Sequence, residues 1–135
     1  MRRKELEQLV LQMENYLECW KQFNHFINLA RAKSFSTEDE NQFLEIKSVL
    51  TQQLEMLLTA IDGGGTTREE IHSLIGDAPS LRYLSELSEN SQRNVENRWH
   101  KVFITWQSLL GQLKVKLREL EGQSFFSSLF GRKKS

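Results

Sequence analysis

Two long stretches of this chain place apolar residues at alternating steps of four and three, which is the spacing of one face of an α-helix. One row lies within residues 6–27 and the other within residues 95–120. A second apolar row accompanies each of them, so each apolar face is wider than the seam of a two-stranded coiled coil. This pattern predicts two long helices in a multi-helix bundle. The two main rows are Leu6, Val10, Met13, Leu17, Trp20 and Ile27, and Val95, Trp99, Val102, Trp106, Leu109, Leu113 and Leu120.

The residues at the expected helix ends set the boundaries of the elements. Ser36 and Thr37 each precede an acidic residue by three positions, which is the pattern of a capped helix start, and the three glycines after Asp62 end that helix. Thr67 and Glu70 form a second capping box. The sequence contains no strand-like alternation and no internal repeat. We therefore expect an all-α fold, an antiparallel bundle of three long helices at about 3–33, 37–61 and 92–121 with a short capped helical segment at about 67–90.

A chain of 135 residues has the length of one domain, which we place at residues 1–122, followed by a C-terminal tail at 123–135. The 18 basic and 18 acidic side chains cancel, so there is no global basic field and we expect no nucleic-acid partner. The charge is unevenly distributed, with +2 over residues 1–36, −8 over 37–97 and +6 over 98–135. This distribution predicts helices that attract each other across the bundle, a surface with one acidic and one basic side, or solvated charged faces without a partner.

The single cysteine and the start of the chain indicate the compartment. Cys19 has no second cysteine with which to form an internal disulfide, and the opening Met-Arg-Arg-Lys is followed by no apolar run of a secretory signal. No stretch approaches the apolar length that a membrane span requires. We therefore expect a cytoplasmic protein that is not integral to a bilayer, with the tail as its one candidate for peripheral membrane contact.

No group of side chains in the sequence has the spacing of a catalytic or metal-binding site. The three histidines lie far apart, and the Glu69–His72 step lacks the second copy that a di-iron bundle requires. The glycines after Asp62 lack the spacing of a phosphate-binding loop. Cys19 lies beside the apolar row of the first helix, where an inert thiol is expected. We therefore expect that the protein is not an enzyme and that it has no metal site and no cofactor.

The C-terminal tail carries apolar side chains that a bundle core does not explain. Four of them lie on one face of a short helix, and a basic cluster comes directly after them. Their burial is worth on the order of 6 to 12 kcal/mol, so we expect something to cover them. The tail either folds back on its own bundle or frays, or docks in a groove of a partner protein, or lies on an anionic membrane surface. The candidate contact residues are Phe125, Phe126, Leu129, Phe130, Arg132, Lys133 and Lys134.

One short stretch resembles a known family. Residues 95–100, Val-Glu-Asn-Arg-Trp-His, are similar to the opening of the third helix in spectrin-type repeats, where an Arg-Trp pair precedes a long heptad helix, and Trp20 on the first helix invites the same comparison. The triple glycine, the separate capped helix after it and the lack of a second repeat depart from that pattern. The resemblance is therefore confined to these residues, and no family is assigned.

These observations favour three functions. The first is a non-enzymatic interaction protein, an adaptor, chaperone or assembly component, that engages a partner through its tail or its acidic face. The second is a self-associating structural module, because the wide apolar faces exceed what one small bundle requires. The third is a bundle that binds a small molecule or a metal. The expected partners are a protein or a second copy of the chain, and the tail gives the chain a candidate contact with an anionic membrane.

Overall fold

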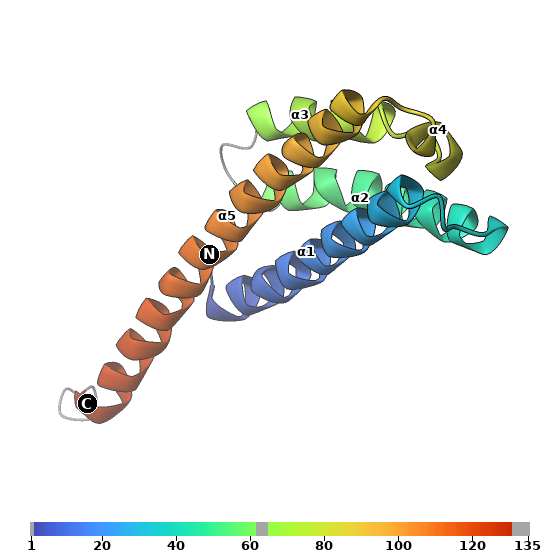
Figure 1. Cartoon of the computed structure of the whole chain (residues 1–135). Helices are drawn as coiled ribbons and strands as arrows, with labels where there is room; N and C mark the ends of the chain where they lie inside the picture. Colours follow the sequence, from blue (N-terminus) through green and yellow to red (C-terminus); the bar gives the residue numbers. More distant parts are fainter. Residues whose placement is uncertain (1, 62–64, 131–135) are drawn as a thin grey trace.

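The computed structural model describes residues 2–61 and 65–130, and every regular element in these ranges is an α-helix. The predicted all-α class is therefore confirmed. The helices succeed one another along the chain and pack into a bundle (Figure 1). They are α1 (Arg3–Arg31), α2 (Thr37–Ala60), α3 (Gly65–Gly76), α4 (Leu81–Ser85) and α5 (Glu89–Phe130).

The helix α1 lies at the centre of the bundle. It packs against α2, α4 and α5, whereas α3 contacts α2 and α5. Both α2 and α5 run antiparallel to α1, as predicted (Figure 1). The 42 residues of α5 give it a length of about 63 Å, against about 44 Å for the 29 residues of α1. The C-terminal end of α5 therefore projects beyond the start of α1 (Figure 1).

The first two long helices end slightly earlier than the predicted 33 and 61. The helix α1 stops at Arg31 because Lys33 has a φ of 55°, the left-handed conformation that closes a helix. The amide of Lys33 donates to the Ala30 carbonyl and that of Ser34 to the Leu29 carbonyl, which satisfies two carbonyls of the last turn. The predicted cap of α2 is present, since Ser36 accepts from the Asp39 amide and the Asp39 carboxylate accepts in return.

The last helix differs most from its predicted range of 92–121. It begins at Glu89, where the Ser88 hydroxyl accepts from the Ser91 amide, and it continues through Gly122 to Phe130. The expected helix end at 121 was wrong. A single glycine costs about 1 kcal/mol in a helix interior, which is too little to end a helix with long helical segments on both sides.

The segment predicted at about 67–90 consists of two separate helices. The first, α3, begins at Gly65, two residues before the predicted start, and ends at Gly76. The second, α4, is held at its start by two side chains. Ser80 caps it, and the Glu40 carboxylate of α2 accepts from the amides of Leu81 and Arg82 at 3.1 and 2.8 Å. This charged acceptor at a helix start fixes α4 against α2.

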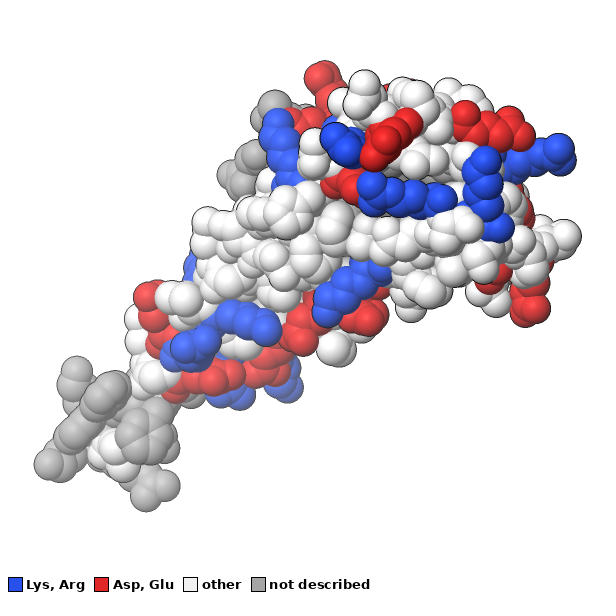
Figure 2. Space-filling view, viewed as in Figure 1, with Lys and Arg blue, Asp and Glu red and all other residues white. Residues whose placement is uncertain are grey.

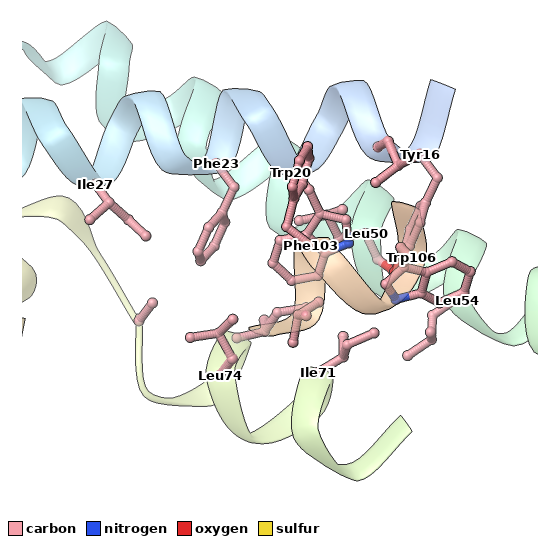
Figure 3. Close-up of a cluster of buried hydrophobic side chains, with 14 of the residues drawn as sticks. Tyr16, Trp20, Phe23, Ile27, Leu50, Leu54, Ile71, Leu74, Phe103 and Trp106 are labelled. Atoms are coloured by element: carbon pink, nitrogen blue, oxygen red, sulfur yellow. The ribbon is translucent and has the colours of Figure 1, made fainter. Parts of the chain in front are cut away.

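The core is a cluster of buried hydrophobic side chains from all five helices, and its aromatic part lies between α1 and α5 (Figure 3). Trp20 and Trp106 are fully buried, and the Tyr16 ring lies 4.9 Å from that of Trp106, centroid to centroid. The indole nitrogen of Trp99 donates to the Trp20 carbonyl at 2.7 Å, and the ring of Trp99 stacks on Phe103. The expectation that the three tryptophans belong to the core is therefore confirmed, with Trp99 half-buried at its edge.

The Tyr16 hydroxyl is the polar link between α1 and α2 in this core. It donates to the Leu50 carbonyl at 2.9 Å, and burial raises the pKa of Tyr16 above its usual range, so the hydroxyl remains a donor. Replacement of Tyr16 by Phe should lower the free energy of unfolding by about 1 kcal/mol, because one buried hydrogen bond is lost while the ring is kept. Urea denaturation checks this, with the exposed Tyr83→Phe as the control that should leave the free energy unchanged. An unchanged value for Tyr16→Phe would contradict it.

Candidate functional site

The C-terminal half of α5 has few contacts with the bundle. Trp106 is fully buried, but no described side chain of α5 beyond it is. Leu109, Leu110 and Leu113 are partly buried against the core, and beyond them Val115 is 52% exposed. The predicted apolar row that ends at Leu120 is therefore buried in its first half, apart from the half-buried Trp99, and only half-buried in its second.

The predicted tail residues lie at the end of this helix. Phe125, Phe126, Leu129 and Phe130 all belong to α5, and Leu129 is 52% exposed. The side chains of the three phenylalanines lie outside the described part of the structure, as do the basic residues Arg132, Lys133 and Lys134. The tail was expected to form a separate short helix after Gly122. It is instead the end of α5.

The direction of α5 bears on the three alternatives for the tail. The helix runs away from the other helices without interruption up to Phe130 (Figure 1). A continuous helix does not reverse, so residues 121–130, called the arm below, do not fold back over the bundle. Fraying of the tail and the two alternatives that place the tail on another molecule remain.

A further row of residues, distinct from the two apolar rows described above, lies on the face of α5 that points away from the core. Ile104 is 49% exposed, Val115 is 52% exposed, and Ser108 and Gly111 between them are exposed as well. These four residues, called the outer stripe below, again alternate steps of four, three and four. The sequence contains this signal, but the stronger rows of the core obscure it, because they occupy the same helix.

The middle of α5 carries no charged residue over a long stretch of its sequence. Residues 102–113 contain no Asp, Glu, Lys or Arg, although 27% of the whole chain is charged. An uncharged area covers the middle of α5 (Figure 2). Beside it, a groove of about 520 Å³ lies between α1 and α5. Its lining includes Leu11, Phe103, Leu110 and Gly111 and also the charged residues Glu14, Glu18, Lys21 and Lys114. Leu11 is 59% exposed at its rim.

Part of the acidic middle of the chain is paired with basic residues of other helices. Glu70 pairs with Lys101 at 3.2 Å, and Asp77 pairs with Arg98 at 2.7 Å, which links the α3 region to α5. Arg31 at the end of α1 pairs with Glu96 of α5. The sequence predicted attraction between helices, a separate acidic face or solvated charged faces, and these pairs are examples of the first. Each is at least partly exposed, so each contributes little to stability.

The remaining titratable candidates do not form a site together. His72 lies 3.7 Å from Glu55 of α2, and Glu69 lines a pocket with Arg98 and Lys101 instead of contacting a second histidine. Within the residues that the structure describes, no three His, Cys, Asp or Glu side chains are grouped closely enough to hold a metal ion. No helix in the described ranges combines the length and the apolar character needed to cross a bilayer.

The chain matches no protein-family model, no curated protein and no solved structure.

Cys19 is half-buried on α1, and its surroundings make it a poor nucleophile. Burial, and then the charge of the neighbouring Glu18, raise the pKa of the Cys19 thiol. Its alkylation by iodoacetamide at pH 8 should therefore be several-fold slower in the folded protein than in urea, because less of the thiol is ionised and its access is restricted. Mass spectrometry over time measures both rates. Faster alkylation of the folded protein would show a thiol activated by its environment.

Proposed function

We propose that this protein is a non-enzymatic interaction protein, an adaptor, chaperone or assembly component, that binds a partner through the arm of α5. The observation that carries the proposal is the projection of α5 beyond the bundle through Gly122 to Phe130. A helix that ends in apolar residues and extends past its own core presents those residues to another molecule. The exposed side chain of Leu129 is the described member of this surface.

The composition of the arm and of the residues after it favours an acidic partner. After Glu121 the chain has no acidic residue and has three basic ones, Arg132, Lys133 and Lys134. The acidic middle of the chain, with a net charge of −8 over residues 37–97, spans α2, α3, α4 and the start of α5 and does not include the arm. A groove of a partner protein with an apolar floor and an acidic rim fits this arrangement, in the way that amphipathic helices dock into grooves.

An anionic membrane is the competing partner, because apolar and basic residues side by side also suit a lipid surface. Four apolar side chains contribute on the order of 6 to 12 kcal/mol when fully buried, and each basic residue adds about 1 kcal/mol near anionic lipid. In either case the proposed location is the cytoplasm, to which the single cysteine Cys19 points. A membrane-bound form would be peripheral.

The test compares the full chain with a variant in which two apolar residues of the arm are made polar. Leu129→Glu combined with Phe126→Glu should abolish retention of a lysate protein by the immobilised chain and leave the helical circular dichroism intact, since the arm contributes no described buried side chain. The matched control is Leu44→Glu on α2, where the side chain is 48% exposed. This control should retain the partner at the wild-type level.

A second measurement separates the two kinds of partner. If the partner is a protein, the amount of wild-type chain that co-sediments with vesicles containing phosphatidylserine should be no greater than the amount that co-sediments with neutral vesicles. If the wild-type chain co-sediments with the anionic vesicles and the double variant does not, the partner is a membrane and not a protein. Equal retention of lysate proteins by wild type and double variant, together with no vesicle binding, would overturn the proposal that the arm binds anything.

A further inference from the structure

The helix α3 covers one side of the core with a single apolar face. Ile71 and Leu74 are fully buried and Ile75 is buried beside them, at positions i, i+3 and i+4 of the helix. This face packs against α2 and α5. We propose that α3 is a lid that opens as a unit over the Trp106 side of the core, while α1, α2 and α5 stay packed together. This inference is independent of the function proposed for the arm.

The polar contacts that join α3 to its neighbours are made by side chains. Glu55 of α2 pairs with Arg68 at 3.0 Å, and Lys101 of α5 pairs with Glu70 at 3.2 Å. Across the residues that the structure describes, no backbone group of α3 hydrogen-bonds to the backbone of another helix. The helix can therefore leave its neighbours without breaking a backbone hydrogen bond to them, which would otherwise oppose its release.

The next helix, α4, is attached in a different way. The amides of Leu81 and Arg82 at its start donate to the Glu40 carboxylate of α2, and the Lys47 ammonium of α2 donates to the Pro79 carbonyl just before it at 3.3 Å. Movement of α4 would break these charge-assisted hydrogen bonds to the backbone, whereas movement of α3 would not. The part that opens should therefore be α3 alone.

The ion pairs that hold α3 are exposed to solvent. In both of the pairs named above, one of the two side chains is more than half exposed. Asp77, directly after α3, pairs with Arg98 in the same way, since Asp77 is 61% exposed. Exposed pairs contribute little to stability, and salt screens them. A pocket of about 280 Å³, with Ser73 and Val102 among its lining residues, also separates α3 from α5 along part of their contact.

The indole N–H of Trp106 opposes the closed position of α3. Its nitrogen is buried and has no hydrogen-bond acceptor among the described residues. Figure 3 shows it on the side of the ring that is turned toward the apolar Leu54 of α2 and Ile71 of α3. A buried donor without an acceptor has lost the hydrogen bond that it makes with water. The closed lid therefore carries a local cost at Trp106, and opening removes this cost.

Trp20 provides a matched internal comparison. Its indole N–H is also buried without an acceptor among the described residues. However, Trp20 belongs to α1 and lies on the α1 side of the cluster, whereas Ile71 and Leu74 lie on the α3 side (Figure 3). The two N–H groups have the same chemistry and neither is held by a hydrogen bond, so the exchange of each with solvent measures its access to water. Opening of α3 should expose the N–H of Trp106 and leave that of Trp20 covered.

The first test measures hydrogen exchange of the full chain in deuterium oxide by NMR. The indole N–H of Trp106 should exchange at least about tenfold faster than that of Trp20, because local opening costs less than global unfolding. The amides of residues 70–75 should also exchange faster than those of residues 20–27 in α1, since a detached helix of 12 residues is only marginally stable. Equal exchange of the two indole groups, or slower exchange at Trp106, would overturn the lid. Fast exchange of Trp106 without the α3 amides would show another path of water into the core and would overturn it as well.

A pair of matched variants tests whether the exposed ion pairs hold the lid closed. Glu55→Gln removes the partner of Arg68, whereas Glu45→Gln removes an exposed carboxylate of the same helix that lines a groove between α1 and α2. The first should raise the exchange rate of the Trp106 N–H several-fold and leave that of Trp20 unchanged, and the second should change neither rate.

Salt should act on the wild-type chain as Glu55→Gln does, because the Debye length falls to about 3 Å at about 1 M sodium chloride. Equal effects of the two variants, or no effect of Glu55→Gln and of salt, would overturn the part of the proposal that assigns closure to these ion pairs. The arm variant Leu129→Glu with Phe126→Glu retains α3 and all of its described contacts, so failure of one proposal does not depend on the other.

Discussion

The fold depends on the aromatic contact between the first and the last helix. Trp20 and Trp106 are the largest fully buried side chains, and Tyr16 lies between them and hydrogen-bonds to α2. This contact joins residues far apart in sequence, so it brings a high loop-closure cost that only a large burial of apolar surface can offset. Once α1 and α5 are fixed against each other, α2 covers one side and the smaller α3 and α4 fill the rest.

A helix held in this way along its first half has a second half that its own bundle covers poorly. The helix α5 consequently has two parts that differ in burial. From Val95 to Trp106 it is a structural element with buried side chains, and from Leu109 onward its apolar residues are half-buried or exposed. The outer stripe spans both halves on the opposite face. The same element thus supplies the core, a surface along its middle and a projecting end.

The sequence predicted the long helices well, because the apolar steps of four and three over residues 6–27 and 95–120 are interrupted only at Asn24 and Lys116. It predicted the end of α5 poorly, since a glycine ends a helix only where the next residues leave the helical conformation, and the residues after Gly122 remain helical. The attachment of α4 was also invisible to the sequence. The Glu40 carboxylate reaches the amides of Leu81 and Arg82 from another helix, and no local pattern records a contact over that separation. The outer stripe was missed for a different reason, because Ser108 and Gly111 are not apolar and the row is recognisable only once the buried face is known.

The continuity of α5 through Gly122 has a mechanical consequence. A flexible linker would let the tip of the chain sample a wide volume around the bundle, whereas an unbroken helix behaves as a stiff lever at this length. A partner bound to the arm, as proposed above, would therefore be held at a set distance from the bundle and in a set direction. In that proposal α5 would act as a spacer with a defined orientation as well as a tether.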